Sequence, residues 1–186
     1  MTQVNVFDSG VCSLGEGALW HPTRNQFFWF DINNSALFTH EDGARVRWDF
    51  DAHVSAAGWV NYDNLMIAHE TSLLLFNLNT HKSEKIVDME ADDPVTRSND
   101  GRADPWGGFW IGTMGKKLEK DAGAIYRYYR GELRTLYAPW TIPNAQCFSP
   151  NCDYAYLTDT PNGEILKQRL DPKDGWPIGD PEVFLT

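Results

Sequence analysis

Cysteine is scarce in this chain of 186 residues, and the three cysteines, Cys12, Cys147 and Cys152, contain no Cys-x-x-Cys pair. An odd number without paired spacing predicts neither a disulfide framework nor a thiolate zinc site. We therefore expect reduced thiols with structural roles.

Positive charge is also scarce, because 16 Lys and Arg stand against 26 Asp and Glu for a net charge of −10. Nucleic-acid binding requires clustered Lys and Arg, and the chain has no basic run. We expect no nucleic-acid partner. Most of the acidity is interpreted as a solvated surface, and the alternative is that part of it lines a cation site.

Long apolar runs are absent as well. No window approaches 18 uninterrupted apolar residues, and residues 1–8 contain no signal-peptide pattern. These absences predict a soluble, cytoplasmic protein without a membrane partner. The chain also has no Gly-x-Ser-x-Gly elbow and no glycine-rich phosphate loop, which disfavours a nucleophilic esterase and a nucleotide enzyme.

Short runs of aromatic and β-branched residues recur between turn clusters, and no stretch shows helical spacing. The chain is therefore predicted to be nearly all-β. The expected strands are Ala18–Trp20, Gln26–Asp31, Ala36–Thr39, Ala57–Val60, Leu65–Ala68, Ser72–Asn77, Phe109–Gly112, Ala124–Tyr129, Ala145–Phe148, Tyr154–Thr158 and Glu164–Arg169.

The strand pattern repeats. Short strands followed by polar turns end at Trp20, Trp59, Asp104 and Phe148, a spacing of about 40 to 45 residues that is typical of four-stranded propeller blades. Four copies of this repeat predict a β-propeller.

The innermost strand of each blade lines the central channel, and functional sites gather at one end of it. The segments before the four expected innermost strands contain Glu16, Asn99 or Asp100, and Asn144. Three oxygen donors at one channel mouth suit a hard cation. The alternatives are that backbone N–H groups satisfy Glu16 and that Asn144 caps the turn after Pro143.

The run from Arg97 to Met114 adds a guanidinium, an amide and a carboxylate within four residues, at Arg97, Asn99 and Asp100. These groups suit an oxygen-rich small molecule. The alternative is an ordinary turn at residues 99–101 with a salt-bridged Arg97.

At these residues the sequence resembles the SMP-30/gluconolactonase/LRE family, which includes regucalcin-like proteins and bacterial sugar lactonases. The resemblance runs from about residue 11 to the end of the chain. The matching segments are Leu14–Trp20, Arg97–Asp104, Phe109–Met114, Ile142–Asn144, Phe148–Pro150 and Tyr156–Thr160.

This resemblance implies a six-bladed propeller, of which the chain supplies about four blades. It also implies an enzyme of the carboxylic-ester hydrolase class that converts a sugar lactone to its aldonic acid. One divalent cation (Ca, Zn, Mg, Mn or Fe) would activate the water that attacks the ring carbonyl.

The resemblance also assigns residues. Glu16 and Asn144 become metal ligands, Arg97 and Asn99 hold the substrate, and Asp100 lines the pocket. The segment 115–121 corresponds to a loop that closes over the site. Some members place a substrate-binding carboxylate there, but this chain has Lys117 at that position, so Glu119 is a weaker candidate.

The family's third metal ligand, which is also the expected general base, is an Asp in a Pro-Asp-Gly motif that we expect beyond Thr186. The catalytic base is therefore unknown within this chain. We expect residues 1–186 to form a single propeller domain that is incomplete at its C-terminus, with a strand around Val4–Phe7 lacking its partner. The readings are a piece of a longer protein, which we favour, a truncated product, or a half-ring that self-associates through unpaired blades.

A competing hypothesis is a regucalcin-like protein that binds calcium or a sugar without turnover, or a truncated inactive relative. A propeller used only as an interaction scaffold is the third possibility. Trp48-Asp49 is isolated and does not close each repeat, which disfavours the scaffold.

Overall fold

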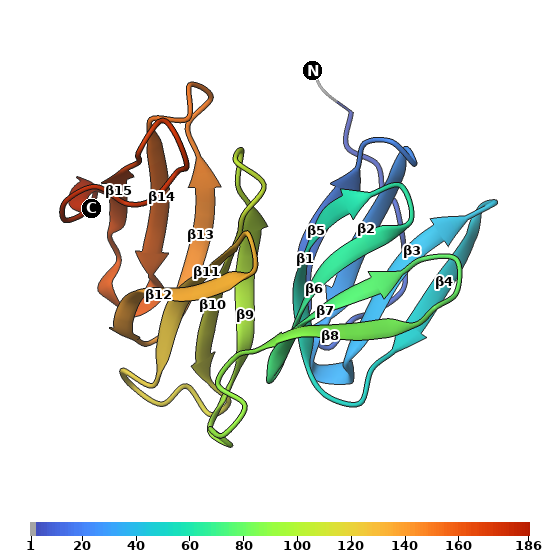
Figure 1. The fold of residues 1–186 in the computed structure, drawn as a ribbon. Coiled ribbons are helices and arrows are strands. Elements are labelled where there is room, and N and C mark those ends of the chain that lie inside the picture. Colours follow the sequence, from blue (N-terminus) through green and yellow to red (C-terminus); the bar gives the residue numbers. More distant parts are fainter. Residues whose placement is uncertain (1–2) are drawn as a thin grey trace.

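The computed structural model describes residues 3–186, which contain four antiparallel sheets of four strands each (Figure 1). The first two sheets comprise β1 (Gly15–His21), β2 (Gln26–Asp31), β3 (Ala36–Glu41) and β4 (Ala44–Asp49), then β5 (Val54–Asn61), β6 (Asn64–His69), β7 (Ser72–Asn77) and β8 (Ser83–Asp88). The other two comprise β9 (Thr96–Ala103), β10 (Phe109–Gly115), β11 (Gly123–Tyr129) and β12 (Glu132–Trp140), then β13 (Pro143–Phe148), β14 (Tyr154–Asp159), β15 (Ile165–Arg169) and β16 (Glu182–Leu185).

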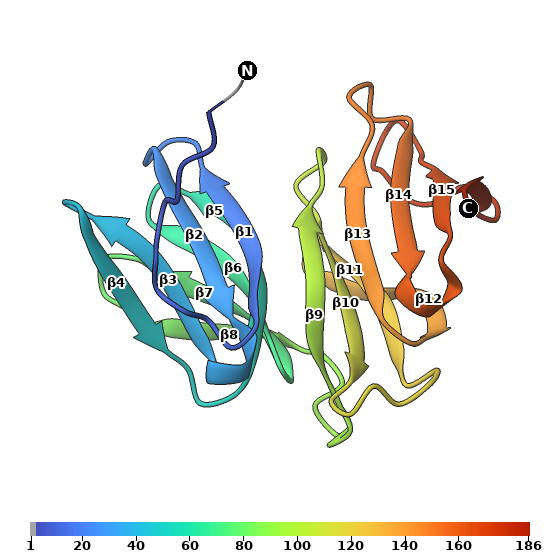
Figure 2. The same ribbon diagram turned by 180° about the vertical axis from the view of Figure 1, so that it is seen from behind.

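Each sheet is an up-and-down meander of consecutive strands, and its first strand packs against the first strand of the next sheet. The strands β1, β5, β9 and β13 therefore lie together on the inner side, as both views show (Figures 1 and 2). The sheets are propeller blades, which confirms the all-β propeller prediction for the four blades present. In residues 3–186 no helix is long and apolar enough to span a membrane.

Apolar side chains fill the space between successive blades. Three clusters of buried residues correspond to the three blade interfaces and centre on Phe28 and Leu65, on Leu73 and Ile111, and on Trp110. Because these residues come from the second and third strands of each blade as well as from the inner strands, each blade buries its faces only against its neighbours.

The sequence prediction missed the outermost strand of every blade. The strands β4, β8, β12 and β16 are mostly exposed and carry few apolar residues in alternation. A strand that is bonded on one edge and solvated on both faces does not need the apolar period on which the prediction rested. Hydrogen bonding to the neighbouring strand, rather than burial, defines these strands.

One alternative is excluded and one expectation was wrong. The alternative of an ordinary turn at residues 99–101 does not hold, because these residues lie inside β9, whose first four residues, from Thr96 to Asn99, are buried. The segment around Val4–Phe7 forms no strand in the described residues, since Val4 and Val6 are exposed. Phe7 instead packs on the rings of Trp29 and His40 in blade one.

A buried carboxylate closes the turn between β9 and β10. Asp104 accepts hydrogen bonds from the backbone N–H groups of Trp106 (2.9 Å) and Gly108 (2.8 Å) and from the Trp110 indole (3.2 Å). It also pairs with Arg127 Nε at 2.7 Å, with both side chains fully buried. The charge is thus matched by donors from three directions.

The same guanidinium joins blade three to blade four. Arg127 Nη2 donates to the backbone oxygen of Asp174 at 2.8 Å, and its Cζ lies 4.4 Å from the ring centres of both Tyr129 and Trp176. Aromatic faces on a guanidinium add cation–π attraction to the ion pair. The pair therefore holds a blade interface as well as a turn.

We expect Asp104→Ala to lower the free energy of unfolding by about 3 to 5 kcal/mol, because it leaves the buried Arg127 charge without its carboxylate. Urea denaturation measures this change. The matched control is Glu132→Ala, which breaks the exposed pair with Arg134 and should change stability little. Equal effects of the two substitutions would contradict the role assigned to Asp104.

A buried histidine links blades one and two. His21 Nε2 donates to the backbone oxygen of Asn61 at 3.0 Å, and Nδ1 accepts the backbone N–H of Arg24 at 3.3 Å. This arrangement requires the neutral ring. Burial lowers the pKa of His21 below its ordinary value of 6.5.

Because the folded pKa of His21 is lowered, the unfolded chain binds more protons below about pH 6.5, and stability should fall as the pH drops through that range. Urea midpoints measured between about pH 7 and about pH 5 should vary less in His21→Gln than in the parent chain. The exposed His81, substituted in the same way, serves as the control and should keep the parent slope. An unchanged slope in His21→Gln would exclude this histidine as the source.

Candidate functional site

Each innermost strand carries a β-bulge near its first residues. The register against the second strand shifts between Glu16 and Leu19 in β1, between Val54 and Ala56 in β5, and between Asn144 and Cys147 in β13, and β9 shifts where Ile111 and Thr113 of β10 face it. A bulge adds one residue to a strand and redirects the side chains beside it. The four blades thus present side chains at equivalent bulged positions.

Backbone conformation shows how closely the inner strands approach. Gly17 has φ +63°, and a Cβ there would lie 2.3 Å from the backbone oxygen of Ser55 on the neighbouring blade. Ala145, just after Asn144, also has positive φ (63°), which is unusual for a residue with a side chain. In blades one and four, the backbone beside the candidate ligand is therefore in the left-handed region.

A directional chain of hydrogen bonds connects β9 to β13. Arg97 Nη1 donates to Asn99 Oδ1 at 3.0 Å, and Asn99 Nδ2 donates to Asn144 Oδ1 at 3.3 Å and to the backbone oxygen of Pro143 at 3.0 Å. Asn144 Nδ2 then donates to Thr160 Oγ1 at 2.8 Å. Since a guanidinium only donates, the Asn99 oxygen must face Arg97, and each following amide has its orientation set in turn.

The candidate residues line one cavity. Its volume is about 220 Å³, and its walls include Glu16, Ser55, Arg97, Asn99, Asp100 and Asn144. A second cavity of about 360 Å³ shares Glu16 and Asp100 with it. Three blades, through β1, β9 and β13, thus bring the sequence-predicted residues together.

The electrostatics of this cavity are set by burial. Burial lowers the pKa of Arg97, while the negative charges of Glu16 and Glu70 oppose that shift. Burial raises the pKa of Asp100 above its ordinary value, and the backbone N–H groups of Ala145, Gly101 and Gln146 oppose that rise. A buried cation and a partly buried carboxyl face the same space.

The segment Gly115–Asp121 covers one side of the site. Leu118, with φ +64° and 61% exposed, lines the cavity. Glu119 Oε2 instead accepts the backbone N–H of Lys117 at 2.9 Å, within its own loop, and is not part of the cavity wall. Of the sequence-predicted residues, Glu119 is the one that the structure leaves apart from the others.

Sequence reasoning missed a group that ties this segment down. Lys116 Nζ donates to Glu70 Oε1 and to the backbone oxygen of Pro94, and Glu70 Oε2 also contacts His53 Nδ1, both Glu70 distances being 2.5 Å. These residues come from four loops that are far apart in the sequence. Their spacing along the chain carries no motif, so only the fold could reveal the group.

The oxygen atoms of Glu16 and Asn144 are the candidate ligands for a hard cation. Glu16 accepts no hydrogen bond from residues 3–186, and the Asn144 oxygen is fixed as an acceptor by the chain from Arg97. No group of three or more His, Cys, Asp or Glu side chains that could hold a metal occurs in the described part of the chain. One carboxylate and one oriented amide oxygen fit Ca²⁺ or Mg²⁺ chemistry.

Residues 14–186 match the model of the SMP-30/Gluconolactonase/LRE-like region. The chain belongs to the SMP-30/gluconolactonase/LRE-like family.

Several family members are similar over most of this chain. A Rhizobium meliloti protein named as a sugar lactone lactonase is 36% identical over 173 residues, covering 92% of this chain and 58% of that protein. A pentonolactonase from Haloferax volcanii is 30% identical over 182 residues, covering 94% of this chain and 59% of that protein.

Among solved structures, regucalcin from Agrobacterium tumefaciens, described as a calcium-binding protein, superposes with a TM-score of 0.92 at 35% identity. The match covers 95% of this chain and 61% of that one. The chain thus spans less than two thirds of the length of these family members.

The bulge in β1 can be tested through Gly17. We expect Gly17→Ala to destabilise the chain by more than Gly43→Ala, because both have positive φ but only Gly17 approaches a backbone oxygen. Left-handed backbone alone costs about 1 to 2 kcal/mol for an alanine. Thermal or urea unfolding measures the difference, and equal losses would show that the contact with Ser55 does not constrain β1.

Proposed function

We propose that this chain forms the substrate site of a sugar lactonase, which hydrolyses a lactone of a sugar acid to the aldonic acid. The observation that carries the proposal is the directional chain from Arg97 through Asn99 to Asn144, which lies in one cavity with Glu16. Donors and acceptors at fixed positions suit a ligand that carries an oxygen on almost every carbon. The family members named as lactonases support the reaction class.

Arg97 and Asn99 would have different roles in substrate binding. Arg97 is 8% exposed and lines the cavity, where its remaining N–H donors would bind ring or hydroxyl oxygens. Asn99 holds the orientation of Asn144 and adds a polar contact beside the substrate. Positioning the lactone in this way lowers the entropic part of the barrier.

Glu16 and Asn144 would hold a divalent cation, in accord with the oxygen donor set. When bound, such an ion supplies Lewis-acid polarisation of the lactone carbonyl and acidifies water. Two protein ligands are fewer than the six to eight that calcium takes. Waters and groups outside these residues would complete the shell, and the donor set alone does not select among Ca, Zn, Mg, Mn and Fe.

We further propose a ring of six blades for the whole protein, of which the present sheets are four. The share of the regucalcin chain that is covered, 61%, agrees with four blades of six. The general base would then come from the remaining part of the ring. Within this chain Asp100, whose pKa is raised by burial, lines the pocket beside the substrate.

A second candidate function is calcium or sugar binding without turnover. The regucalcin structure, whose description names calcium binding, is the observation that favours it. Both functions use the same cavity, but only the lactonase releases acid. A measurement of lactone hydrolysis therefore distinguishes the two functions, whereas a measurement of metal binding does not.

Acid release from D-glucono-1,5-lactone, followed with a pH indicator, tests the proposal. We expect EDTA to abolish it, and Glu16→Ala or Asn144→Ala to lower both metal affinity and rate by about 100-fold or more. Arg97→Ala should raise KM and lower metal affinity less than Asn144→Ala does, because the backbone oxygen of Pro143 still holds the Asn99 amide. The exposed Arg134→Ala is the control.

Full activity in a chain that lacks both Glu16 and Asn144 would refute the metal assignment. Metal binding without any acid release would favour the binding protein over the enzyme.

A further inference from the structure

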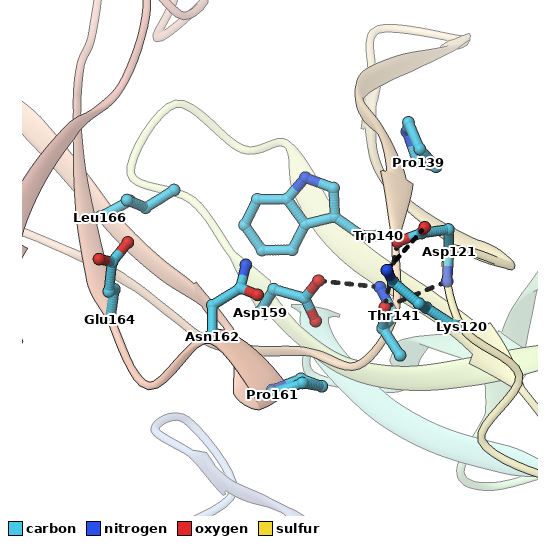
Figure 3. Close-up of a pocket in the computed structure, with 10 residues that line it drawn as sticks. All are labelled: Lys120, Asp121, Pro139, Trp140, Thr141, Asp159, Pro161, Asn162, Glu164 and Leu166. Atoms are coloured by element: carbon cyan, nitrogen blue, oxygen red, sulfur yellow. Dashed lines mark hydrogen bonds and ion pairs between the residues drawn. The ribbon is translucent and has the colours of Figure 1, made fainter.

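A separate groove lies between blades three and four, on the side where β12 leads into β13 (Figure 3). Its volume is about 570 Å³, which is in the range of small-molecule sites. Trp140, Leu166 and the polar side chains of Asn162 and Glu164 form its walls. None of these residues takes part in the site described above.

Two segments run from this groove into the cavity of the candidate site. Trp140 and Thr141 line the groove, and Ile142 and Asn144, on the same strand path, line the cavity. Four residues of extended chain span at most about 14 Å, so the Cα atoms of Trp140 and Asn144 are no farther apart than that.

The segment Gly115–Asp121 also runs from the groove to the cavity. Lys120 and Asp121 line the groove, while Leu118 lines the cavity. Thr160, which accepts the Asn144 amide, lies between Asp159 and Pro161 of the groove wall. The groove and the cavity are therefore neighbours, and one ligand of two linked rings could occupy both.

The chemistry of the groove is that of a sugar subsite. One side of the half-buried Trp140 ring packs near Tyr137, with ring centres 5.9 Å apart, and the ring extends towards Leu166 and Asn162 (Figure 3). A flat aromatic face beside hydrogen-bonding groups matches the apolar and hydroxyl faces of a pyranose. Within residues 3–186, the side chains of Asn162 and Glu164 form no hydrogen bond, so both are available to hydroxyl groups.

Charge limits the ligand further. Asp121, Asp159 and Glu164 stand in the groove against the single cation Lys120. Asp159 is already engaged, because its carboxylate accepts the backbone N–H groups of Thr141 (3.0 Å) and Ile142 (2.7 Å). An excess of negative charge disfavours a phosphate, sulfonate or carboxylate in the groove. Sugar hydroxyl groups donate hydrogen bonds that carboxylates accept, so a neutral sugar fits these walls.

We propose that the groove at Trp140 binds a neutral glycosyl unit attached to the lactone, so that the preferred substrates are disaccharide lactones of the aldobionolactone class. This inference rests on the proposed lactonase function, since the lactone ring itself would lie in the cavity with Arg97. Trp140 stacks on the distal ring, and Asn162 and Glu164 bind its hydroxyl groups. The distal unit contributes binding energy away from the reacting carbonyl.

The experiment compares kcat/KM for cellobiono-1,5-lactone and D-glucono-1,5-lactone in the full-length protein that contains the parent chain and in its Trp140→Ala variant. The parent chain should favour the disaccharide lactone by about tenfold, and Trp140→Ala should lose that preference while its rate on gluconolactone stays within about twofold. Trp59→Ala, which removes another partly exposed indole from a different cavity, is the matched control and should keep the preference.

A second pair of variants guards against loss of folding in Trp140→Ala. Asn162→Ala and Glu164→Gln change the hydrogen-bonding groups of the groove without removing its apolar wall, and both should reduce the preference for the disaccharide. Hydrolysis of both lactones at equal rates by the parent chain, or a preference unchanged in all three groove variants, would overturn the proposal and leave the lactonase function standing.

If the full-length protein hydrolyses neither lactone, the proposed function fails, and the groove is tested by itself. Nuclear magnetic resonance titration with cellobiose should then broaden or shift the indole N–H signal of Trp140 and not that of Trp59. Absence of such a shift would overturn the groove as a sugar site.

Discussion

The guanidinium of Arg97 donates hydrogen bonds and cannot accept them, and the rest of the site takes its orientation from that fact. Arg97 fixes the Asn99 oxygen, the Asn99 amide fixes the Asn144 oxygen, and Asn144 ends on Thr160. An asparagine amide by itself could face either way. Because this series of hydrogen bonds begins at a group with only donors, the amide oxygen of Asn144 is held as an acceptor. It lies in the cavity that Glu16 also lines.

β-Bulges in the inner strands make this arrangement possible. A regular strand alternates its side chains between two faces, so consecutive polar residues such as Ser98, Asn99 and Asp100 would point apart. The bulges beside Glu16, Asp100 and Asn144 change that alternation. The left-handed backbone at Gly17 and Ala145 is the conformational cost of the change. The apolar clusters between the blades stabilise the scaffold against it.

The sequence predicted the repeat and the blades because these depend on periodic apolar runs. Blade position and a motif with specific spacing also predicted that Glu16, Arg97, Asn99, Asp100 and Asn144 lie together, and all five line one cavity. The sequence pattern placed Asn99 and Asp100 before the third inner strand, whereas β9 already begins at Thr96, because Thr96 to Ala103 are almost all polar. It also missed the exposed outer strands such as β16, where pairing rather than burial determines the structure. The contacts of Glu70 with His53 and Lys116 join three loops, and no local pattern encodes them. Glu119 is the opposite case. Its residue type and its loop suited a substrate contact, but its carboxylate accepts the backbone N–H of Lys117 in the same loop.

The proposed cation site lies at the inner strands, although the loop of residues 88–93 carries more carboxylates. Titration of the isotopically labelled chain with Mn²⁺, followed by nuclear magnetic resonance, distinguishes the two places directly, because the ion broadens the signals of nearby protons. We expect the broadening at low Mn²⁺ to centre on the side-chain amides of Asn99 and Asn144 and on the backbone amide of Gly17. Broadening that centres on residues 88–93 and spares Asn144 would contradict it.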